Sequence, residues 1–446
     1  MSERLLSVGL DVGTTSTQMV VSELLVENRA SGFAVPEMVI ADRKILYRSP
    51  VYFTPLVEGK LVNGEELRSI VEEEYRKAGI TREKVDTGAV IITGETSRKE
   101  NARTVVNALS EYAGEFVVAT AGPDLESVLA AKGAGAADYS SETGKTVLHM
   151  DIGGGTSNLA LIRDGKILRT GCLNVGGRLV KFSQDGLVSY LSPVLRGLSD
   201  MQVGERSTKW QRTALAEKLA SALEMAAGRK PTEPLLSQLL TEEAGKPWVP
   251  PEEPVVVSFS GGVADCIREE LEDFAFGDLG PELGRAIRRS SLYQSGYILG
   301  RETIRATVIG AGCYSTQLSG STVYHQNVKF PLKNVPVVKL SDREKGIHSP
   351  EDGPVILVPE EIRSFSYRQI VKLADRVSRI SVGRILVCLE QDMAKALGHA
   401  LAVRMPADAE ILCIDRIRVE EGSYLDIGQP VAGAVPVVVK TLVLSK

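Results

Sequence analysis

The chain has 446 residues, of which 43% are hydrophobic and 24% charged, and its formal net charge is −5 at pH 7. These values predict a soluble globular protein with two or three domains. The acidic charge argues against nucleic acid or an anionic membrane as the main partner, and no apolar run approaches the ~18 residues that a membrane-spanning helix needs. Its five cysteines are scattered without a zinc-like spacing, so we expect reduced thiols in a cytoplasmic protein.

Strand-like and helix-like segments alternate over residues 1–140. Strand-like runs and turns fill residues 5–55, and the spacing of apolar residues predicts a helix over 65–78 that ends at Gly79. The pattern then predicts strands at 89–93 and 116–119 and helices at 99–112 and 127–137. Strands that alternate with helices indicate an α/β fold, so we expect a first α/β domain here.

A second α/β domain is expected over residues 141–320. It begins with a hairpin whose turn is Asp164-Gly165-Lys166. Six prolines in residues 228–254 predict a loop-like excursion from this domain. The remaining pattern predicts helices at 178–191, 208–227 and 263–274 and strands at 255–260 and 307–312.

The sequence changes in character after residue 320, where prolines interrupt the chain more often. A helix at 365–378, a strand at 384–389 and a helix at 391–403 precede strand-rich sequence up to Leu444. We therefore expect residues 321–446 to form a C-terminal α/β extension.

Two stretches, Asp11–Gln18 and Asp151–Asn158, are similar to each other: an aspartate ends an apolar strand, a loop of glycines and hydroxyl residues follows, and a second strand begins. The backbone N–H groups and hydroxyls of such a loop can bind phosphate oxygens, and its aspartate can hold a divalent cation by charge. Two copies predict a duplicated scaffold that binds one polyphosphate from both sides. For either aspartate alone, a hydrogen bond to its own turn is the alternative.

Other phosphate-binding motifs find no support. A Walker-A loop would have to end at Gly144-Lys145-Thr146, but its first glycine would then fall on Tyr139. A GxGxxG sequence after a strand is also missing, so dinucleotide binding has little support.

Three further features are candidates for the same site. Gly261-Gly262 follows a strand and begins a helix, where the backbone can approach a ligand closely, although a tight turn is the plainer explanation. Asp124 and Glu126 begin a helix, so they either cap it or orient a water molecule for attack on a phosphate. His149 shares a strand face with Asp151, and we expect it to be a core histidine with its hydrogen bonds satisfied.

In this order, the motifs resemble those of the actin-like ATPase superfamily, which includes sugar kinases, heat-shock ATPase chaperones and actin. The loop at Asp11 resembles its first phosphate segment, the loop at Asp151 its second, and Ser260–Ala264 its adenosine segment. Helices at 123–135 and 307–316 would form the connecting segments at the interdomain hinge, although the local pattern predicts a strand at 307–312.

Within that superfamily, the chain closely resembles the ethanolamine ammonia-lyase reactivating factors from end to end. The segments that carry this resemblance are Gly9–Gln18, Thr93–Thr96, Gly122–Ala130, Asp151–Asn158 and Gly422–Gly428. The resemblance implies a chaperone-like ATPase that uses ATP and Mg²⁺ to release damaged cobalamin from inactivated ethanolamine ammonia-lyase, so that intact adenosylcobalamin can bind. Cobalamin would belong to that client enzyme, and the tail after 320 or residues 228–254 are the candidates for client recognition.

The resemblance also implies two ribonuclease-H-like lobes with ATP or ADP in the cleft between them. By position it implies metal contacts from Asp11 and Asp151, and assistance of hydrolysis by Asp124 or Glu126, between which the sequence does not decide. The nucleotide contacts that it implies come from Gly13, Thr14, Thr15, Ser16, Gly153, Gly154, Gly155, Thr156, Ser157, Gly261 and Gly262. Thr93 or Thr96 is a further candidate, for a metal or phosphate contact.

Three other functions remain open on the sequence. A small-molecule kinase would use the same lobes, and its ATP turnover would be strongly stimulated by a metabolite. A filament-forming actin relative would sediment in a nucleotide-dependent way. A binding scaffold without turnover is the third, and the presence of both Asp11 and Asp151 weighs against it. Homo-oligomer formation and entry into a bacterial microcompartment also stay open.

Overall fold

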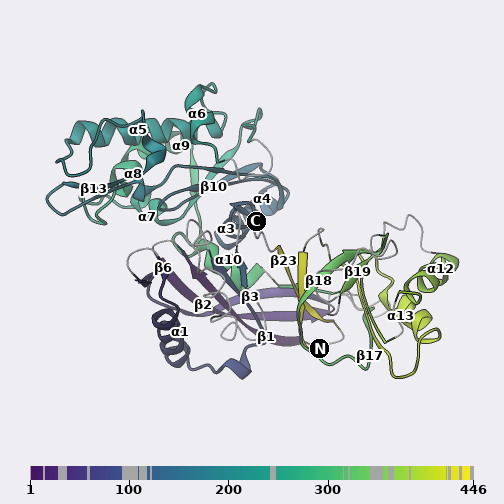
Figure 1. Cartoon of the computed structure of the whole chain (residues 1–446). Coiled ribbons are helices and arrows are strands. Elements are labelled where there is room, and N and C mark those ends of the chain that lie inside the picture. Colours follow the sequence, from purple (N-terminus) through teal and green to yellow (C-terminus); the bar gives the residue numbers. More distant parts are fainter. Residues whose placement is uncertain are drawn as a thin grey trace.

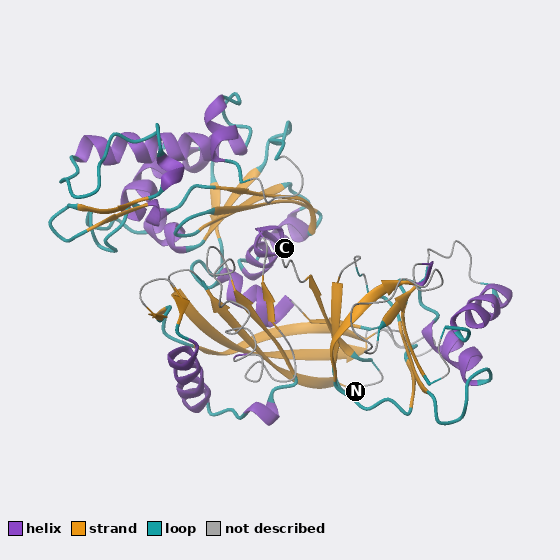
Figure 2. Ribbon diagram, in the orientation of Figure 1, coloured by secondary structure: helices purple, strands orange, loops and turns teal. Residues whose placement is uncertain are grey.

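The computed structural model places three larger sheets and their covering helices (Figures 1 and 2). The residues that it describes are 2–13, 16–28, 38–57, 61–92, 109, 118–120, 123–241, 248–314, 316–319, 322–341, 355–359, 366–380, 383–417, 419, 423–430 and 434–441. In Figure 1 the second sheet and its helices, in teal, lie above the first sheet, in purple, and the third sheet, in green and yellow, lies beside the first.

The first sheet has the strand order β3-β2-β1-β7-β8, with β4 also paired to β2. Its strands are β1 (Ser2–Val12), β2 (Ser16–Asn28), β3 (Met38–Arg48), β4 (Tyr52–Phe53), β7 (Thr87–Ile92) and β8 (Val118–Thr120). β1, β2 and β3 are antiparallel, and β1, β7 and β8 are parallel. A short ribbon, β5 (Leu56–Val57) and β6 (Leu61–Val62), precedes the helix α1 (Gly64–Ala78).

Helix α1 covers one face of the first sheet, as its sequence predicts. Asn63 accepts a hydrogen bond from the backbone N–H of Glu66 at the helix start, and Gly79 ends the helix in the left-handed conformation with φ 68°. Leu67, Val71 and Tyr75 of the helix are buried against β1, β2 and β7. The expected helix at 65–78 is therefore confirmed.

The second sheet repeats the first, with the strand order β11-β10-β9-β14-β15. Its strands are β9 (Val147–Ile152), β10 (Ser157–Arg163), β11 (Lys166–Leu173), β14 (Val256–Ser260) and β15 (Tyr297–Leu299). As in the first sheet, the three strands that are consecutive in the chain are antiparallel, and two parallel strands follow on the other side. This repeated order is that of a ribonuclease-H-like lobe, so the expected pair of lobes is confirmed.

Helices cover both faces of the second sheet. On one face lies the large core that includes α5 (Lys209–Ala226), α6 (Pro234–Leu239), α7 (Gly262–Arg268), α8 (Gly280–Arg289) and α9 (Ser291–Gln294). On the other face lie α3 (Pro123–Gly133) and α4 (Ala136–Thr143). Capping helps to fix the start of α5, because the Thr208 and Gln211 side chains each accept a hydrogen bond from the other's backbone N–H.

Helices α3 and α10 (Ala306–Tyr314) cross between the two sheets. α3 packs on β9, β10 and β11 of the second sheet, whereas α10 packs on β1, β2 and β7 of the first. Glycine permits this contact: a Cβ atom on Gly310 would lie 2.1 Å from the carbonyl oxygen of Leu129, and one on Gly133 would lie 1.9 Å from that of Ala306. The two lobes are thus joined through one tightly packed pair of helices.

The third sheet has eight strands, in the order β16-β23-β22-β18-β19-β20-β21-β17. They are β16 (Thr316–Leu318), β17 (Tyr324–Gln326), β18 (Leu332–Lys339), β19 (Ile356–Val358), β20 (Arg384–Cys388), β21 (Glu410–Ile414), β22 (Ser423–Ile427) and β23 (Pro436–Thr441). Helices α12 (Tyr367–Val377) and α13 (Ala394–Ala402) cover one face with one apolar core, and a second core lies on the other. This agrees with the helices and strands expected in the C-terminal extension.

Several sequence expectations differ from the structure. The helix predicted at 178–191 is wrong: this stretch holds a 3₁₀ turn (Gly177–Leu179) and the hairpin of β12 (Val180–Phe182) and β13 (Val188–Leu191), which turns at Gly186 with φ 84°. The strand predicted at 307–312 is the helix α10. The helix predicted at 263–274 ends at Arg268, the one at 127–137 is broken between α3 and α4, and the one at 99–112 falls almost entirely outside the described residues.

The proline-rich stretch 228–254 is more ordered than expected where the structure describes it. Its helix α6 buries Leu236 and Leu239, and the Trp248 indole N–H donates to the carbonyl oxygen of Ala226 at 3.0 Å. All five cysteines are buried and free of disulfides, as expected. In the described part of the chain, no helix has both the length and the apolarity to cross a bilayer.

Candidate functional site

The two loops that are similar in sequence form the same turn. In the loop from β1 to β2, the N–H of Gly13 donates to the carbonyl oxygen of Ser16 at 2.8 Å. In the loop from β9 to β10, the N–H of Gly153 donates to that of Thr156 at 2.9 Å. Thr14 and Thr15 lie outside the described residues. The duplication predicted from sequence is therefore matched by the same backbone hydrogen bond in both loops.

Each aspartate of the two loops has an amide residue directly opposite on the neighbouring strand. Asp11 pairs with Gln18, and Asp151 pairs with Asn158. Cross-strand partners lie on the same face of a sheet, so each loop presents one carboxylate and one amide together. Sequence reasoning did not single out Gln18 and Asn158, although their equal distance from the two aspartates was a signal that could have found them.

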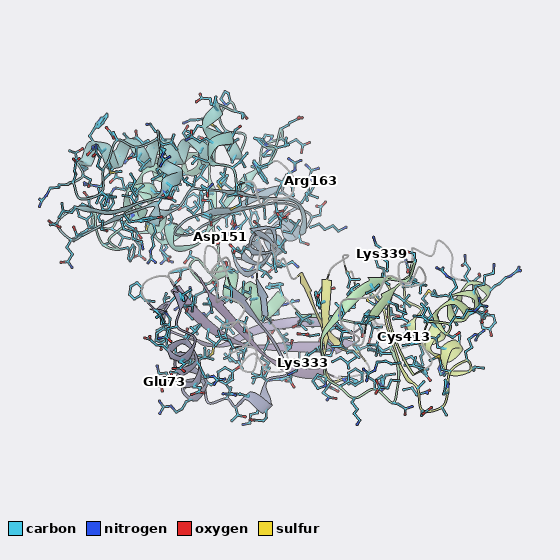
Figure 3. All side chains as sticks on the ribbon, viewed as in Figure 1. Glu73, Asp151, Arg163, Lys333, Lys339 and Cys413 are labelled. Carbon is cyan, nitrogen blue, oxygen red and sulfur yellow. The ribbon has the colours of Figure 1, made fainter. Side chains whose placement is uncertain are left out.

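The segment just before and at the start of α10 links the two loops. Gln18 donates through Nε2 to the carbonyl oxygen of Ile304 at 3.2 Å, and the Thr307 side chain forms a hydrogen bond with Asp151. The N–H of Gly261 donates to the carbonyl oxygen of Thr303 at 3.0 Å. Residues from the two loop-and-strand units and from the Gly-Gly turn are thus brought together at 303–307. Figure 3 shows Asp151 on the side of its lobe that lies toward the first lobe.

Asp151 is a buried carboxylate at the end of β9, with 9% of its surface exposed. The Ser260 hydroxyl donates to its Oδ1, and the Thr307 hydroxyl adds a second hydrogen bond. Burial raises the pKa of Asp151 to about 6, although the hydrogen bonds from Ser260 and Thr307 each lower it. A cation near this carboxylate would offset the cost of its buried charge.

The imidazole of His149 lies between two serine hydroxyls. Its Nδ1 lies 3.1 Å from Ser258 Oγ and its Nε2 lies 2.9 Å from Ser260 Oγ. Burial lowers the pKa of His149 to about 3, so the ring is neutral at physiological pH. As expected from sequence, it is a core histidine with both nitrogens satisfied.

Two buried amide oxygens beside the aspartates have no hydrogen-bond partner among the described residues. Asn158 donates through Nδ2 to Glu126 Oε2 at 2.7 Å, just as Gln18 donates to Ile304. The Glu126 carboxylate and the Ile304 carbonyl oxygen each accept a hydrogen bond, so each must face an amide NH₂ group. This fixes the orientation of both amides. Among the described residues, neither Gln18 Oε1 nor Asn158 Oδ1 has a hydrogen-bond partner, although both side chains are buried. A bound water or ligand would satisfy them.

The two acidic candidates of α3 have different surroundings. Glu126 is buried and accepts the hydrogen bond from Asn158, whose strand partner is Asp151. Asp124 is exposed and accepts a hydrogen bond from the Thr170 hydroxyl at 2.5 Å. Glu126 is therefore connected to the aspartate loop, whereas Asp124 contacts β11.

The remaining residues of the second loop are held by hydrogen bonds to the segment 175–178. The carbonyl oxygens of Gly153 and Gly154 accept hydrogen bonds from the backbone N–H groups of Gly177 and Arg178, at 3.0 and 2.6 Å. Ser157 is fully buried, and its hydroxyl donates to the carbonyl oxygen of Val175 at 2.7 Å. Gly155 is exposed at the tip, Thr156 is partly exposed, and Ser16 begins β2 opposite Phe53.

At the Gly-Gly turn, Gly261 has a φ of 84°, and a Cβ atom there would lie 2.3 Å from the carbonyl oxygen of Ile152. Glycine is thus required for β14 to turn into α7 beside the second loop. Gly262 is the first residue of α7. Thr93 and Thr96 lie outside the described residues.

The donor set fits a magnesium ion held together with a nucleotide. Within the described ranges, no group of three or more histidine, cysteine, aspartate or glutamate residues is placed to hold a metal. Mg²⁺ usually takes one or two carboxylates and completes its shell with phosphate oxygens and water. Asp11 and Asp151 are carboxylates of that kind, and the amide oxygens of Gln18 and Asn158, which have no partner among the residues that the structure describes, could accept hydrogen bonds from the cation's water molecules.

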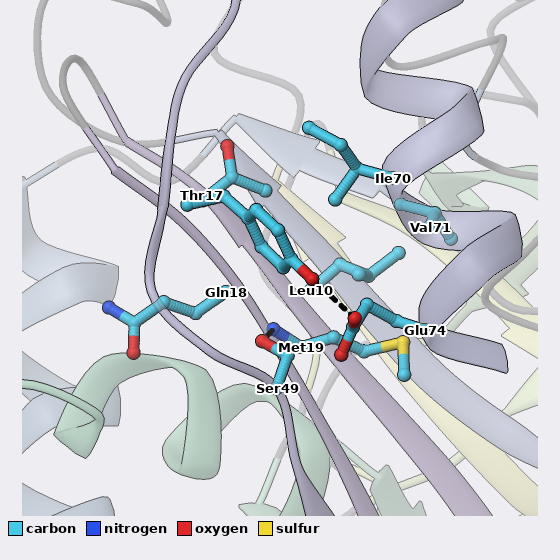
Figure 4. Close-up of a pocket in the computed structure, with 9 residues that line it drawn as sticks. Leu10, Thr17, Gln18, Met19, Ser49, Ile70, Val71 and Glu74 are labelled. Carbon is cyan, nitrogen blue, oxygen red and sulfur yellow. Dashed lines mark hydrogen bonds between the residues drawn. The ribbon is translucent and has the colours of Figure 1, made fainter. Parts of the chain in front are cut away.

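A small pocket on the α1 side of the first sheet belongs to the core (Figure 4). Its carboxylate, Glu74, accepts hydrogen bonds from the hydroxyls of Tyr47 and Tyr52 and from Lys77 Nζ, at 2.7, 2.5 and 2.8 Å. Burial raises the pKa of Glu74, but these three hydrogen bonds outweigh it and leave the pKa below its usual value. Glu74 therefore stabilises the packing of α1 on the sheet.

Comparisons with known proteins match one family over nearly the whole chain. The family described as "Ethanolamine utilisation protein EutA" matches residues 3–445. The "Ethanolamine ammonia-lyase reactivase EutA" of Salmonella typhimurium is 37% identical and that of Escherichia coli K12 is 38% identical, each over 99% of both chains. Among solved structures, the PPX-GPPA enzyme of Aquifex aeolicus is 12% identical, with a TM-score of 0.42, over 69% of this chain and 99% of its own.

Proposed function

The chain belongs to the family of the ethanolamine utilisation protein EutA, and we propose that it is an ATP-dependent reactivase of ethanolamine ammonia-lyase. Two proteins named as reactivases of that enzyme match it from end to end, and this is the observation that carries the proposal. The reactivase releases damaged cobalamin from the inactivated lyase, and intact adenosylcobalamin then binds. Association with a bacterial microcompartment, where the client would be found, is part of the same proposal.

The duplicated loops are the proposed site for ATP or ADP with Mg²⁺. Asp11 and Asp151 hold the cation by charge, directly or through its water molecules. The backbone N–H groups of the two loops bind the phosphates, and Gly261-Gly262 lies against the nucleoside. The matching hydrogen bond in each of the two loops, the raised pKa of Asp151 and the two amide oxygens without a partner in the described part of the chain support this assignment. When bound, the cation neutralises phosphate charge and so favours attack by water on the γ-phosphate.

Glu126 is the proposed residue that orients the attacking water. It lies beside Asn158 of β10, which fixes the carboxylate through a 2.7 Å hydrogen bond. A carboxylate held in this way can accept a proton from water at the moment of attack. Asp124 is the alternative. It is exposed and accepts a hydrogen bond from Thr170 of β11, which favours a structural role for it.

The chemistry at the loops reaches the client through the contact between the lobes. The Thr307 hydroxyl of α10 bonds to Asp151 in the second lobe, and α10 packs on the first sheet. A change of nucleotide at Asp151 therefore shifts the populations of open and closed lobes. One arrangement binds the lyase in a form with an open cobalamin site, and each tenfold loss of cobalamin affinity requires about 1.4 kcal/mol.

A recovery assay tests this function. Ethanolamine ammonia-lyase loaded with hydroxocobalamin is incubated with the protein, ATP, Mg²⁺ and fresh adenosylcobalamin, and ammonia release is measured. We expect activity to return with the wild type and not with Asp151→Asn. Asp164→Asn is the matched control, because Asp164 lies in an exposed turn at φ 51°, a conformation that asparagine tolerates.

Failure to restore the lyase, together with ATP hydrolysis that a metabolite stimulates strongly, would replace the proposal with a small-molecule kinase. Nucleotide-dependent sedimentation without recovery would instead point to a filament.

A further inference from the structure

A chain of hydrogen bonds runs from the core of the second lobe to Asp151. It connects Ser258, His149, Ser260 and Asp151 in that order, across the paired strands β14 and β9. His149, Ser258 and Ser260 are each at most 1% exposed. The nucleotide contacts proposed above make no use of these three side chains.

The direction of the chain follows from the number of protons available. Ser260 has one hydroxyl proton, and it is donated to Asp151 Oδ1. Ser260 Oγ must therefore accept from His149, so the ring carries its proton on Nε2. In the neutral ring Nδ1 is then an acceptor, and the Ser258 hydroxyl donates to it at 3.1 Å. Every donor in the chain points toward the carboxylate.

We propose that His149 is a positioning residue for the cation of the bound nucleotide: acting through Ser260, it fixes Asp151 Oδ1 and leaves the other carboxylate oxygen to serve the cation. The inference rests on the proposed function. Without the N–H of His149, the Ser260 hydroxyl can rotate and donate elsewhere, and Asp151 is then held by the Thr307 hydroxyl without the bond that fixes its Oδ1. A hydrogen-bond chain with one direction also strengthens each of its members by polarisation.

A purely structural role for His149 predicts something different. If the ring only fills a polar core position, every substitution there lowers stability and none changes cation affinity selectively. Replacing His149 with glutamine or with asparagine separates these cases. The glutamine amide nitrogen reaches the place of the ring's Nε2, and the asparagine amide nitrogen reaches that of Nδ1. His149→Gln keeps a donor to Ser260, whereas His149→Asn keeps only the contact with Ser258.

Binding of Mn²⁺ in the presence of ADP, followed by the electron paramagnetic resonance signal of free Mn²⁺, is the test. We expect His149→Asn and Ser260→Ala to weaken Mn²⁺ binding about ten- to hundredfold, the range for loss of a hydrogen bond to a charged group. His149→Gln should weaken it less than about threefold on the same reasoning. Binding of ADP alone, measured with EDTA, and the unfolding midpoint should be similar for His149→Gln and His149→Asn.

The outcomes separate the two proposals. Equal Mn²⁺ affinities for His149→Gln and His149→Asn would overturn the positioning role, and so would an unchanged affinity in Ser260→Ala. If the wild type itself bound no Mn²⁺–ADP, the proposed nucleotide site would fail first. If His149→Asn does not fold, the other two variants still decide the matter. Ser260→Ala removes the hydrogen bond to Asp151, whereas His149→Gln keeps the donor that holds the Ser260 hydroxyl in place.

Discussion

Replacing Asp151 with asparagine should stabilise the free protein while it abolishes cation-dependent nucleotide binding. Burial raises the pKa of Asp151 from 3.8 to about 6. At about 1.4 kcal/mol for each pKa unit, the ionised carboxylate costs about 3 kcal/mol of folding stability at pH 8. The neutral amide removes this cost and still accepts the hydroxyl hydrogen bonds. The gain is an upper value, since the new NH₂ group also needs an acceptor.

The sign of the pH dependence follows from the direction of the shift. A carboxyl whose pKa is higher in the folded state favours folding of the protonated form, so its cost is present above pH 6 and absent below about pH 4. The stability difference between Asp151→Asn and the wild type should therefore shrink as the pH falls through this window. Cation affinity of the wild type should fall in the same window, because protons compete for the carboxylate.

Differential scanning fluorimetry at pH 8 and pH 4.5, with and without Mg²⁺–ADP, measures these effects. At pH 8 we expect a higher unfolding midpoint in Asp151→Asn, by up to about 10 °C for a lobe of this size. Mg²⁺–ADP should raise the midpoint of the wild type and not that of the variant. An Asp151→Asn protein less stable than the wild type without ligand would refute the reasoning, because the carboxylate would then already be compensated. Asp164→Asn should match the wild type throughout.

Three further predictions concern the lobes and the water-orienting group. In a phosphate-release assay, Glu126→Gln should lower ATP hydrolysis by at least about a hundredfold while nucleotide binding is retained, and Asp124→Asn should lower it by less than about threefold. The reverse order would assign the role to Asp124. Gly310→Ala should lower the free energy of unfolding, measured by chemical denaturation, by about 1–3 kcal/mol, because its Cβ would lie 2.1 Å from a carbonyl oxygen. The control Gly383→Ala, whose Cβ would have nothing within 4 Å, should leave it unchanged. Equal stabilities of the two variants would show a looser helix crossing. Gln18→Leu should weaken Mn²⁺–ADP binding about tenfold in the same resonance assay, and an unchanged affinity would exclude its amide oxygen from the site.

The elements that could be predicted from sequence are those determined by local pattern. The helix of residues 64–78 has an N-cap, an apolar stripe and a C-terminal glycine, so its position follows from nearby residues alone. The paired loops are visible for the same reason, because the acidic residue, the glycines and the flanking apolar strands are contiguous.

Other elements depend on contacts that are distant in sequence. The run Thr307–Gly312 contains Val308 and Ile309, which favour a strand, but the close approach of α3 at Gly310 is compatible with the observed helix. Likewise, the apolar spacing in 178–191 suggests a helix, whereas the observed hairpin is held by more distant residues: the Phe182 N–H donates to the carbonyl oxygen of Gly277 at 2.8 Å, and the Val188 N–H donates to that of Glu205 at 2.9 Å.

The candidate site shows the same division. The aspartates and glycines could be predicted, since they stand in two recognisable loops. Ser260 and Thr307 could not be placed beside Asp151 from sequence, because they are more than a hundred residues away and reach it only through sheet pairing and the crossing of α10. Glu126 could be preferred over Asp124 only once its contact with Asn158 was known.

Release of cobalamin from the client is the measurement that tests reactivation most directly. Ethanolamine ammonia-lyase carrying hydroxocobalamin is incubated with the protein, and free cobalamin in the filtrate is measured by its absorbance. We predict release with ATP and Mg²⁺, little release without nucleotide, and none above background with Asp151→Asn. Equal release with and without nucleotide, or ATP hydrolysis with no cobalamin in the filtrate, would contradict an ATP-driven reactivase.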